Sequence, residues 1–274
     1  DGRESAASAT QTLLKQFAAP VKASEPVYTT VSAGSYTASM TYTVASGVTR
    51  VSALKASDTT YSVIPSSVMG QTLANFPIQN AMYPRWEMSI AFRSTGKNNA
   101  FRALIGDKRN QVNSGSNSGW SVNISDTNTF MFIGSDGTVF WNASTITFAQ
   151  NTDYVLTLTK TSASLTVEVT NVTANTTQTA TNTAIASNSL SPVNGPVTLG
   201  GWINNSTENF VGTISYVNVV PALASATASS GSATLTVPFT DADTPLNVKV
   251  VALANADGRE SAASATQTLL KQFA

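Results

Sequence analysis

The chain has 274 residues, with 15 basic and 15 acidic side chains and neither cysteine nor histidine. A formal net charge of zero argues against nucleic acid or an anionic membrane as the main partner, because both require a basic face. The missing residue types exclude disulfides, zinc-thiolate sites, thiol nucleophiles and a Ser-His-Asp arrangement. No apolar stretch approaches the ~20 residues that span a bilayer, so we expect no membrane insertion.

The chain opens on a segment that is repeated, residue for residue, at its end. Residues 1–18 (DGRESAASATQTLLKQFA) are identical to residues 257–274, which gives a period of 256 residues from Asp1 to Asp257. This identity predicts a tandem array in which the chain holds one period and the start of the next. The alternative is a duplicated linker or an artefact of the cloned sequence. Within the repeated segment, Ser5 to Phe17 is compatible with either a helix or a strand.

Most of the remaining chain shows the period-2 alternation of half-buried strands. Turn clusters such as Ser94 to Asn99 and Asn113 to Gly119 separate these runs. Many short alternating strands at regular spacing predict an all-β, antiparallel sandwich or jelly roll. The clearest predicted strands are Tyr36–Val44, Trp86–Phe92, Trp120–Ile124, Tyr154–Thr159, Leu165–Thr170, Val211–Val219 and Ala233–Val237.

From about residue 66 to residue 222 the order of these elements resembles a concanavalin A-like, laminin G-like jelly roll. The stretch Arg85–Arg93, followed by Phe101–Gly106, is similar to the family's bulky strand and its arginine-bearing neighbour. The pair Asp153–Lys160 and Ala163–Val169 is similar to the hairpin that crosses the family's sheet. Val197–Trp202 and Asn209–Val217 resemble its closing glycine-rich strand and return. The resemblance implies two facing antiparallel sheets over residues 63–222.

The flanking segments have a different pattern. Gly34–Met40 with Val51–Leu54 resembles Gly231–Val237 with Val251–Leu253, and Val248–Ser261 is similar to the end of a fibronectin type III domain. We therefore expect residues 1–62 and 223–274 to be halves of a small immunoglobulin- or fibronectin-like sandwich that straddles the repeat boundary. The two halves either close on each other or pair with neighbouring molecules, because strand edges invite such pairing.

Paired carboxylates for glycoside hydrolysis are not apparent in the sequence. The resemblance implies that a hydrolase would carry an E-x-D-x-x-E or E-x-D-x-E stretch on one strand, and none occurs here. Glu87 and Glu168 each stand alone in their strands, so we interpret both as solvent-facing carboxylates. The sequence thus predicts a protein that is not an enzyme.

Carbohydrate binding is the better-supported chemistry. Sugar sites combine an aromatic platform with planar amides and carboxylates. Trp120 follows a long polar loop, Asp107 to Gly119, and Trp141 follows an Asp-Gly turn. Trp86, in the middle of a strand, is expected in the core. The candidate sugar-binding residues are Trp120, Trp141, Asp107, Arg109, Asn113, Asn117 and Asn142.

The loop before Trp120 also offers oxygen ligands for a metal ion. Asp107 and Asn110 are the candidate calcium ligands, a site that the resemblance to lectins suggests near the ligand loop. The loop carries one carboxylate among neutral amides, with Lys108 and Arg109 adjacent, so calcium is an optional cofactor in this prediction.

These observations favour an extracellular unit displayed on a cell or virion surface. Its expected function is adhesion through weak carbohydrate binding, multiplied by tandem copies, with a surface glycan and neighbouring copies of the repeat as partners. The alternative is a purely structural extender or filament protomer, joined head-to-tail by strand pairing at the repeat boundary.

Overall fold

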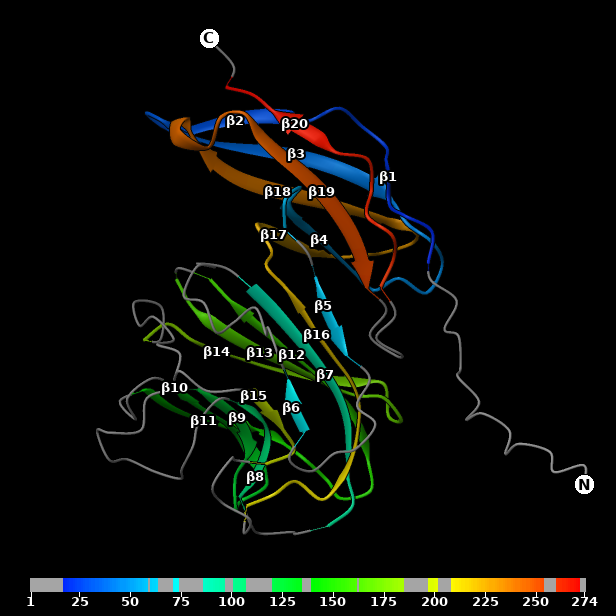
Figure 1. Cartoon of the computed structure of the whole chain (residues 1–274), viewed down its shortest axis with the longest axis vertical. Coiled ribbons are helices and arrows are strands. Elements are labelled where there is room, and N and C mark those ends of the chain that lie inside the picture. The colour runs from blue at the N-terminus through cyan, green and yellow to red at the C-terminus, as the bar shows by residue number, and fades with distance from the viewer. Residues whose placement is uncertain are drawn as a thin grey trace, which may run out of the picture.

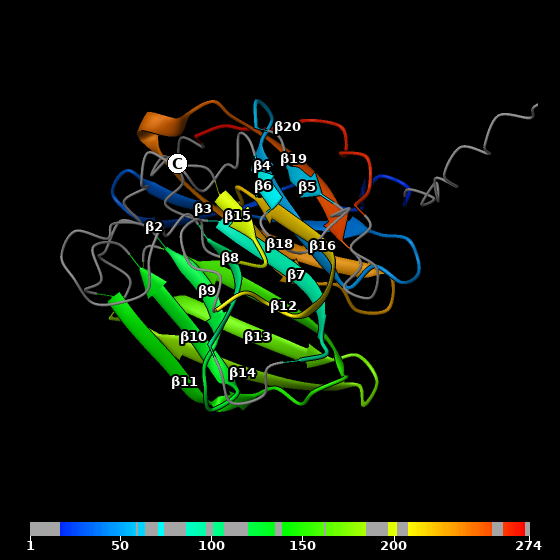
Figure 2. The same cartoon turned by 60° about the horizontal axis from the view of Figure 1, so that its bottom comes forward.

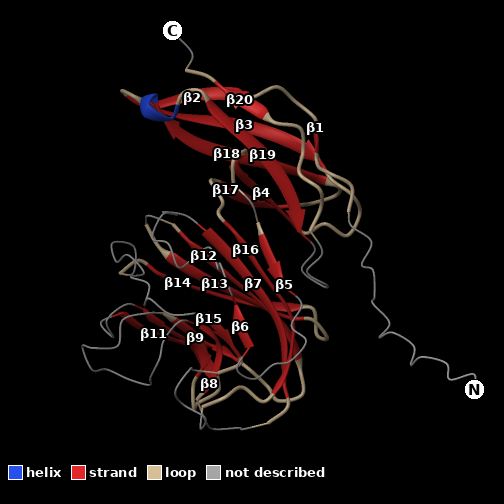
Figure 3. Cartoon of the chain, viewed as in Figure 1, coloured by secondary structure: helices blue, strands red, loops and turns tan. Residues whose placement is uncertain are grey.

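The computed structural model describes residues 17–58, 60–63, 71–73, 86–96, 101–106, 120–134, 139–161, 163–184, 197–201, 208–253 and 260–271. These residues form four antiparallel sheets, which build two β-sandwiches stacked along the long axis (Figure 1). Among the described residues, the short 3-10 helix η3 (Asp241–Asp243) is coloured blue in Figure 3, where the strands are red. No helix in the described ranges is long and apolar enough to cross a membrane. The predicted all-β antiparallel class is confirmed.

The larger sandwich consists of two six-stranded sheets. One has the order β11-β10-β9-β8-β15-β6 and the other β14-β13-β12-β7-β16-β5. Turning the molecule brings this sandwich forward and shows the strands of the two sheets as separate layers (Figure 2). The strands are β5 (Tyr61–Val63), β6 (Gln71–Leu73), β7 (Trp86–Ser94), β8 (Arg102–Gly106), β9 (Ser121–Ile124), β10 (Thr129–Gly134), β11 (Val139–Thr147), β12 (Asp153–Lys160), β13 (Leu165–Asn171), β14 (Thr176–Asn182), β15 (Val197–Leu199) and β16 (Gly212–Val220).

Alternation along these strands fills the space between the two sheets. On β7, Met88, Ile90 and Phe92 point inward and are almost completely buried, as Trp86 is at the start of the strand. Each large apolar side chain removed from water contributes roughly 1.5–3 kcal/mol. The inward rings of Phe92 and Phe148 lie 5.6 Å apart, a separation favourable for aromatic packing. The period-2 pattern therefore identified the core of this sandwich, including Trp86.

The smaller sandwich is built from both flanks of the chain. β3 pairs with β18 along nine residues, and β4 pairs with both β17 and β19. The flanks thus close on each other within one chain, and the larger sandwich is inserted between β4 and β17. The strands are β1 (Val21–Lys22), β2 (Val27–Ser32), β3 (Ser35–Thr43), β4 (Arg50–Lys55), β17 (Ala224–Thr227), β18 (Ser232–Thr240), β19 (Leu246–Leu253) and β20 (Gln267–Leu269).

An apolar joint connects the two sandwiches. Leu54, Val251 and Leu253 lie on the face of β4 and β19 that points away from the core of the small sandwich. They pack against Val220 and Ala222 at the end of β16, and all five side chains are at most 3% exposed. We call these five residues the joint cluster. Burial of this extent indicates that the two sandwiches contact each other through a dry surface.

The C-terminal copy of the repeated segment is extended. Its residues 267–269 form β20, which pairs antiparallel with β19. Helix and strand were both open for this sequence, and the copy at residues 260–271 is a strand with extended flanks. Of the N-terminal copy, the described part begins at Phe17, which packs on the small core.

Candidate functional site

The two tryptophans predicted as sugar platforms lie in the core, so that prediction is wrong. Trp120 is 0% and Trp141 is 9% exposed. Trp120 precedes Val122 and Ile124 at alternate positions, and alternate residues share one face of a strand. Trp141 lies opposite Phe132 on β10 and packs edge-on against Phe130, with ring centroids 5.3 Å apart. Both indoles therefore fill the space between the sheets.

The other predicted loop residues, Asp107, Arg109, Asn110, Asn113 and Asn117, lie outside the described residues. The strand ends that carry this loop are described. Gly106 at the end of β8 pairs with Ser121 at the start of β9, and Ser121 pairs with Ile133 near the end of β10. The loop before Trp120 and the turn before Trp141 therefore depart from adjacent strands at one end of one sheet.

We call the outer side of this sheet the polar face. Cross-strand partners share a side of the sheet, and two rows of partners cross it. The first row is Asn142, Met131, Asn123 and Ala103, and the second is Ile133, Ser121, Gly106 and Thr198. The described side chains of these rows are at most 6% exposed except Asn142, which is exposed. Small and polar side chains thus alternate with apolar ones along both rows.

At the other end of the polar face, hydroxyls and one amide form a network. Ser125 shares hydrogen bonds of 2.9 Å with Thr127 and 2.7 Å with Thr129. The Thr129 hydroxyl donates to Asn142 Oδ1 at 2.8 Å, which leaves the Asn142 amide group pointing outside this network. Phe101, half-buried, packs on the apolar members of the face. The sequence placed Phe101 at the start of the stretch Phe101–Gly106 but assigned it no binding role. Its two-residue offset from Ala103 is the signal that places it outward.

The two carboxylates that stand alone in their strands, Glu87 and Glu168, both lie against the guanidinium of Arg50. Glu87 is not solvent-facing as predicted: its side chain is 1% exposed. The Arg50 guanidinium from the small sandwich donates to both its oxygens, Nε to Oε1 at 3.0 Å and Nη2 to Oε2 at 2.7 Å. Glu168 lies 3.6 Å from the same guanidinium. No local pattern in the sequence predicts this contact, because Arg50 and Glu87 meet only through the packing of two sandwiches.

Electrostatics around Arg50 favour its charged form. Burial alone would lower the pKa of Arg50, but the charges of Glu87 and Glu168 and the hydrogen bonds to Glu87 raise the pKa above its ordinary value. The single positive charge of Arg50 lies against both carboxylates, of which Glu87 is buried and Glu168 is partly exposed. Their arrangement serves the joint between the sandwiches.

Arg102 is a second buried cation, at the edge of the larger core. It is 1% exposed and donates to the Ser94 hydroxyl at 3.0 Å and to Asn128 Oδ1. Burial lowers the pKa of Arg102. Asn128 has a left-handed backbone (φ 60°), which asparagine tolerates better than most residues. Arg102 therefore ties a turn of one sheet to the end of β7 in the other.

The described residues contain no group of three or more acidic side chains that could hold a metal ion. A hollow of about 380 Å³ lies on the small sandwich, lined by residues of the β4 end and of η3. It holds one cation, Lys55, and one carboxylate, Asp243, which accepts hydrogen bonds from the Thr240 amide and hydroxyl. The hollow thus has no paired carboxylates among its lining residues.

Sequence comparisons with family models and with curated proteins give no match. Among solved structures, the chain is similar to the CBM40 of Ruminococcus gnavus IT-sialidase bound to alpha2,3 sialyllactose. That likeness has a TM-score of 0.45 and 15% identity, and covers 63% of this chain and 94% of the other. The leech intramolecular trans-sialidase gives 0.43 and 14%, covering 67% and 27%. The bacteriophage CBA120 tailspike protein 2 enzymatically active domain gives 0.38 and 12%, covering 81% and 30%.

Proposed function

We propose that this chain is a non-enzymatic, carbohydrate-binding unit of an extracellular tandem-array surface protein, and that it mediates adhesion. The observation that carries the proposal is the polar face. There, Asn142 is exposed and held by Thr129, while Ser125 and Thr127 extend the same network. Hydroxyls and amides fixed by one another present donors and acceptors to sugar hydroxyls at little entropic cost.

The polar face supplies the two kinds of contact that a sugar requires. The half-buried ring of Phe101 offers an apolar surface for the sugar ring. The amide of Asn142 and the exposed hydroxyl of Thr127 offer directional hydrogen bonds. Met131, Asn123 and Ala103, which share a row with Asn142, are buried. A sugar would therefore meet the face at its exposed edge, where Asn142 and Thr127 lie.

The proposed weakness of the site is compatible with adhesion because of the repeated ends. Residues 1–18 and 257–274 are identical, as expected where one period follows another. A few neutral hydrogen bonds give low affinity for each unit. Linked copies raise the effective concentration of the second site, so overall avidity can exceed single-site affinity by about 10²–10⁴-fold.

A glycan array probed with the full chain tests the proposal. It should include neutral oligosaccharides and sialyllactose, the sugar named with the CBM40 neighbour. Asn142→Ala and Thr127→Ala should each weaken binding about two- to tenfold, the loss of one net hydrogen bond. Thr179→Ala is the matched control, because Thr179 is equally exposed on β14 of the opposite sheet. Binding unaffected by both face variants contradicts a glycan site on the polar face.

A purely structural extender is the second candidate function. The observation that favours it is the joint cluster together with the Arg50–Glu87 ion pair, which lock the two sandwiches into one unit. Such a unit holds its length when pulled or packed in a fibre. A glycan array without reproducible signal for the full chain would favour this candidate over carbohydrate binding.

A further inference from the structure

The C-terminal repeated segment is docked along β19 over its whole described length. Ser261 N donates to Ala252 O at 2.9 Å, and Ser264 N donates to Val250 O at 2.8 Å. The Ser261 and Ser264 hydroxyls accept hydrogen bonds from the amides of the same two β19 residues. Beyond them, β20 continues the pairing, with Leu269 opposite Leu246. Residues 260–271 therefore complete this sheet as its edge strand.

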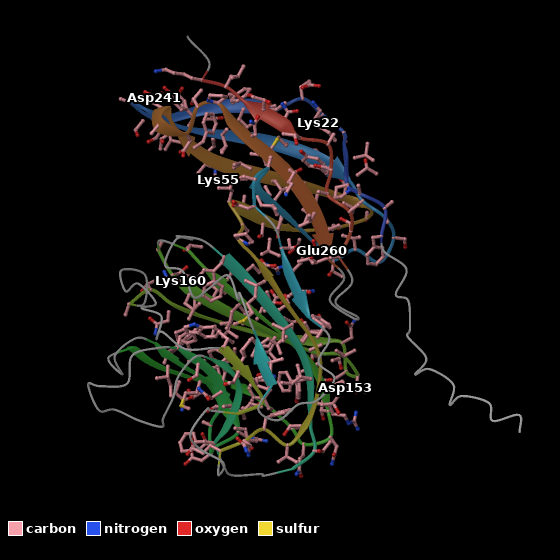
Figure 4. All side chains as sticks on the ribbon, viewed as in Figure 1. Lys22, Lys55, Asp153, Lys160, Asp241 and Glu260 are labelled. Atoms are coloured by element: carbon pink, nitrogen blue, oxygen red, sulfur yellow. The ribbon has the colours of Figure 1, made fainter. Side chains whose placement is uncertain are left out.

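Side chains fix the register of this docked strand. Leu269 is 0% exposed in the core of the small sandwich. The Lys22 ammonium donates to Gln267 Oε1 at 2.8 Å, and the Thr268 hydroxyl donates to Asn247 Oδ1 at 2.8 Å. Lys271 forms an ion pair with Asp241 at 3.0 Å. Glu260 lies toward the joint and Asp241 at the opposite end of the small sandwich, so the strand runs its full length (Figure 4).

Every residue of the docked segment is present a second time in the chain. Residues 4–15 (ESAASATQTLLK) are identical to residues 260–271, so Leu13 corresponds to Leu269 and Lys15 to Lys271. We propose that residues 4–15 of one copy can occupy the place of β20 along β19 of another copy. This inference rests on the tandem arrangement proposed above. In such an array, the strand that completes the sheet of one unit continues directly into the chain of the next unit.

Chain geometry excludes the same exchange within one molecule. The docked segment runs from Ala252 to Leu246 of β19, six residues or about 20 Å. Phe17 is held at the Ser261 end, where it forms a parallel bridge with Ser261. Only four residues lead from Leu13 to Phe17, and they reach at most about 14 Å. Leu13 therefore cannot take the place of Leu269 in its own molecule while Phe17 stays bound.

The same arithmetic sets the spacing of units in an array. The residue that acts as Leu269 of one unit is Leu13 of the next, and it lies within about 14 Å of that unit's Phe17. Phe17 itself packs on the small core beside Gly47. The four residues between Leu13 and Phe17 thus keep the small sandwiches of successive units close to each other.

The experiment uses one substitution at two identical positions of the full chain. Leu269→Asp places a carboxylate in the core and should release the resident strand, so that a second molecule's residues 4–15 enter. Light scattering after size exclusion should then show oligomers that grow with concentration. Leu13→Asp alone should remain monomeric, and the double variant should lose the oligomers. A monomeric Leu269→Asp chain, or equal oligomers in the double variant, overturns the proposal.

Peptide complementation covers the case in which Leu269→Asp disturbs folding. A peptide with the sequence of residues 4–15 should raise the Tm of the double variant saturably, as any ligand of the folded state does. The same peptide with aspartate at its first leucine should have no effect. No rise in Tm with the unmodified peptide contradicts a vacant strand site along β19. Neither result depends on glycan binding, so failure here is separable from failure of the carbohydrate proposal.

A disulfide reports the register directly, because the chain has no cysteine of its own. Asn247 lies opposite Thr268, and the matching donor residue is Thr12. In the Leu269→Asp background, Asn247→Cys with Thr12→Cys should give covalent multimers on a non-reducing gel. Asn247→Cys with Thr268→Cys in the otherwise unchanged chain should give an internal bond and no multimers. Absence of multimers in the first variant overturns the proposed register.

Discussion

The indole of Trp120 fills space between the two sheets of the larger sandwich, where it is 0% exposed. Trp120→Ala should therefore destabilise the protein by about 3–5 kcal/mol, the cost of emptying a large aromatic site in a core. Thermal or denaturant unfolding measures the loss. Ser144→Ala, an exposed control on β11 of the same sheet, should stay within about 0.5 kcal/mol. Equal and small effects from both variants would contradict the buried position of Trp120.

The Arg50–Glu87 ion pair makes a second prediction for single residues. Glu87→Ala removes one partner of a largely buried pair and should cost about 3–5 kcal/mol, because Arg50 is left without its main counter-charge. Arg50→Met with Glu87→Leu should recover much of the loss, since an apolar pair of similar volume avoids desolvation of charge. Denaturant unfolding of the three variants tests this. A double variant no more stable than Glu87→Ala would argue against a desolvated pair.

At the residue scale, strand alternation predicted the buried Trp86 correctly, but the same signal was overruled for Trp120 and is missing for contacts between the sandwiches. The alternation of Trp120 with Val122 and Ile124 already contained the burial of the indole, but the adjacent polar loop suggested a sugar platform. Arg50 and Glu87 carry no local signal, because each belongs to a different sandwich and their contact depends on how the two are joined. The outward direction of the Phe101 side chain can be predicted only once Ala103 is known to face outward.

At the scale of single elements, the segment that carries β20 is held by an ion pair that depends on pH, between Lys271 just after the strand and Asp241. The hydrogen bond from Lys271 lowers the pKa of Asp241, and the same bond raises the pKa of Lys271. A lowered carboxyl pKa adds stability that is complete above the unfolded value, about 3.9, and is lost as the pH falls through the folded value. We expect the amide resonance of Leu269 to shift and broaden below about pH 4. Asp241→Asn should remove this acid response, and an unchanged response in that variant would contradict the anchor.

Element-level prediction was strong for strands but, apart from the hairpin of β12 with β13, silent on their partners. The period-2 runs located β3, β7, β12, β13, β16 and β18, because their alternation reflects burial of one face. The repeated segment stayed undecided between helix and strand, since Leu, Ala and Gln favour helices while its pairing partner, β19, lies outside the segment. Pairing with β19 decides between helix and strand. In the extended segment the Ser261 and Ser264 hydroxyls accept hydrogen bonds from backbone amides of β19.

At the scale of the whole molecule, two features couple the sandwiches. The chain crosses between them twice, after β4 and after β16, and the joint cluster buries five apolar side chains between them. In the sequence, the insertion is visible only as two similar flanks. Their closure within one chain follows from the pairing of β3 with β18. A twice-connected, dry contact predicts that neither sandwich unfolds without disturbing the other.

Calorimetry tests this coupling. The full chain should unfold in one cooperative transition, because loss of either sandwich exposes the joint cluster to water. Val220→Asp buries a charge in that cluster, where Val220 is 1% exposed, and should separate the melt into two transitions. Thr181→Asp, an exposed change on β14, is the control and should keep a single transition. Two transitions in the unmodified chain would mean that contacts at the joint are too weak to make the two sandwiches unfold together. A rigid extender would then need its stiffness from contacts with neighbouring copies.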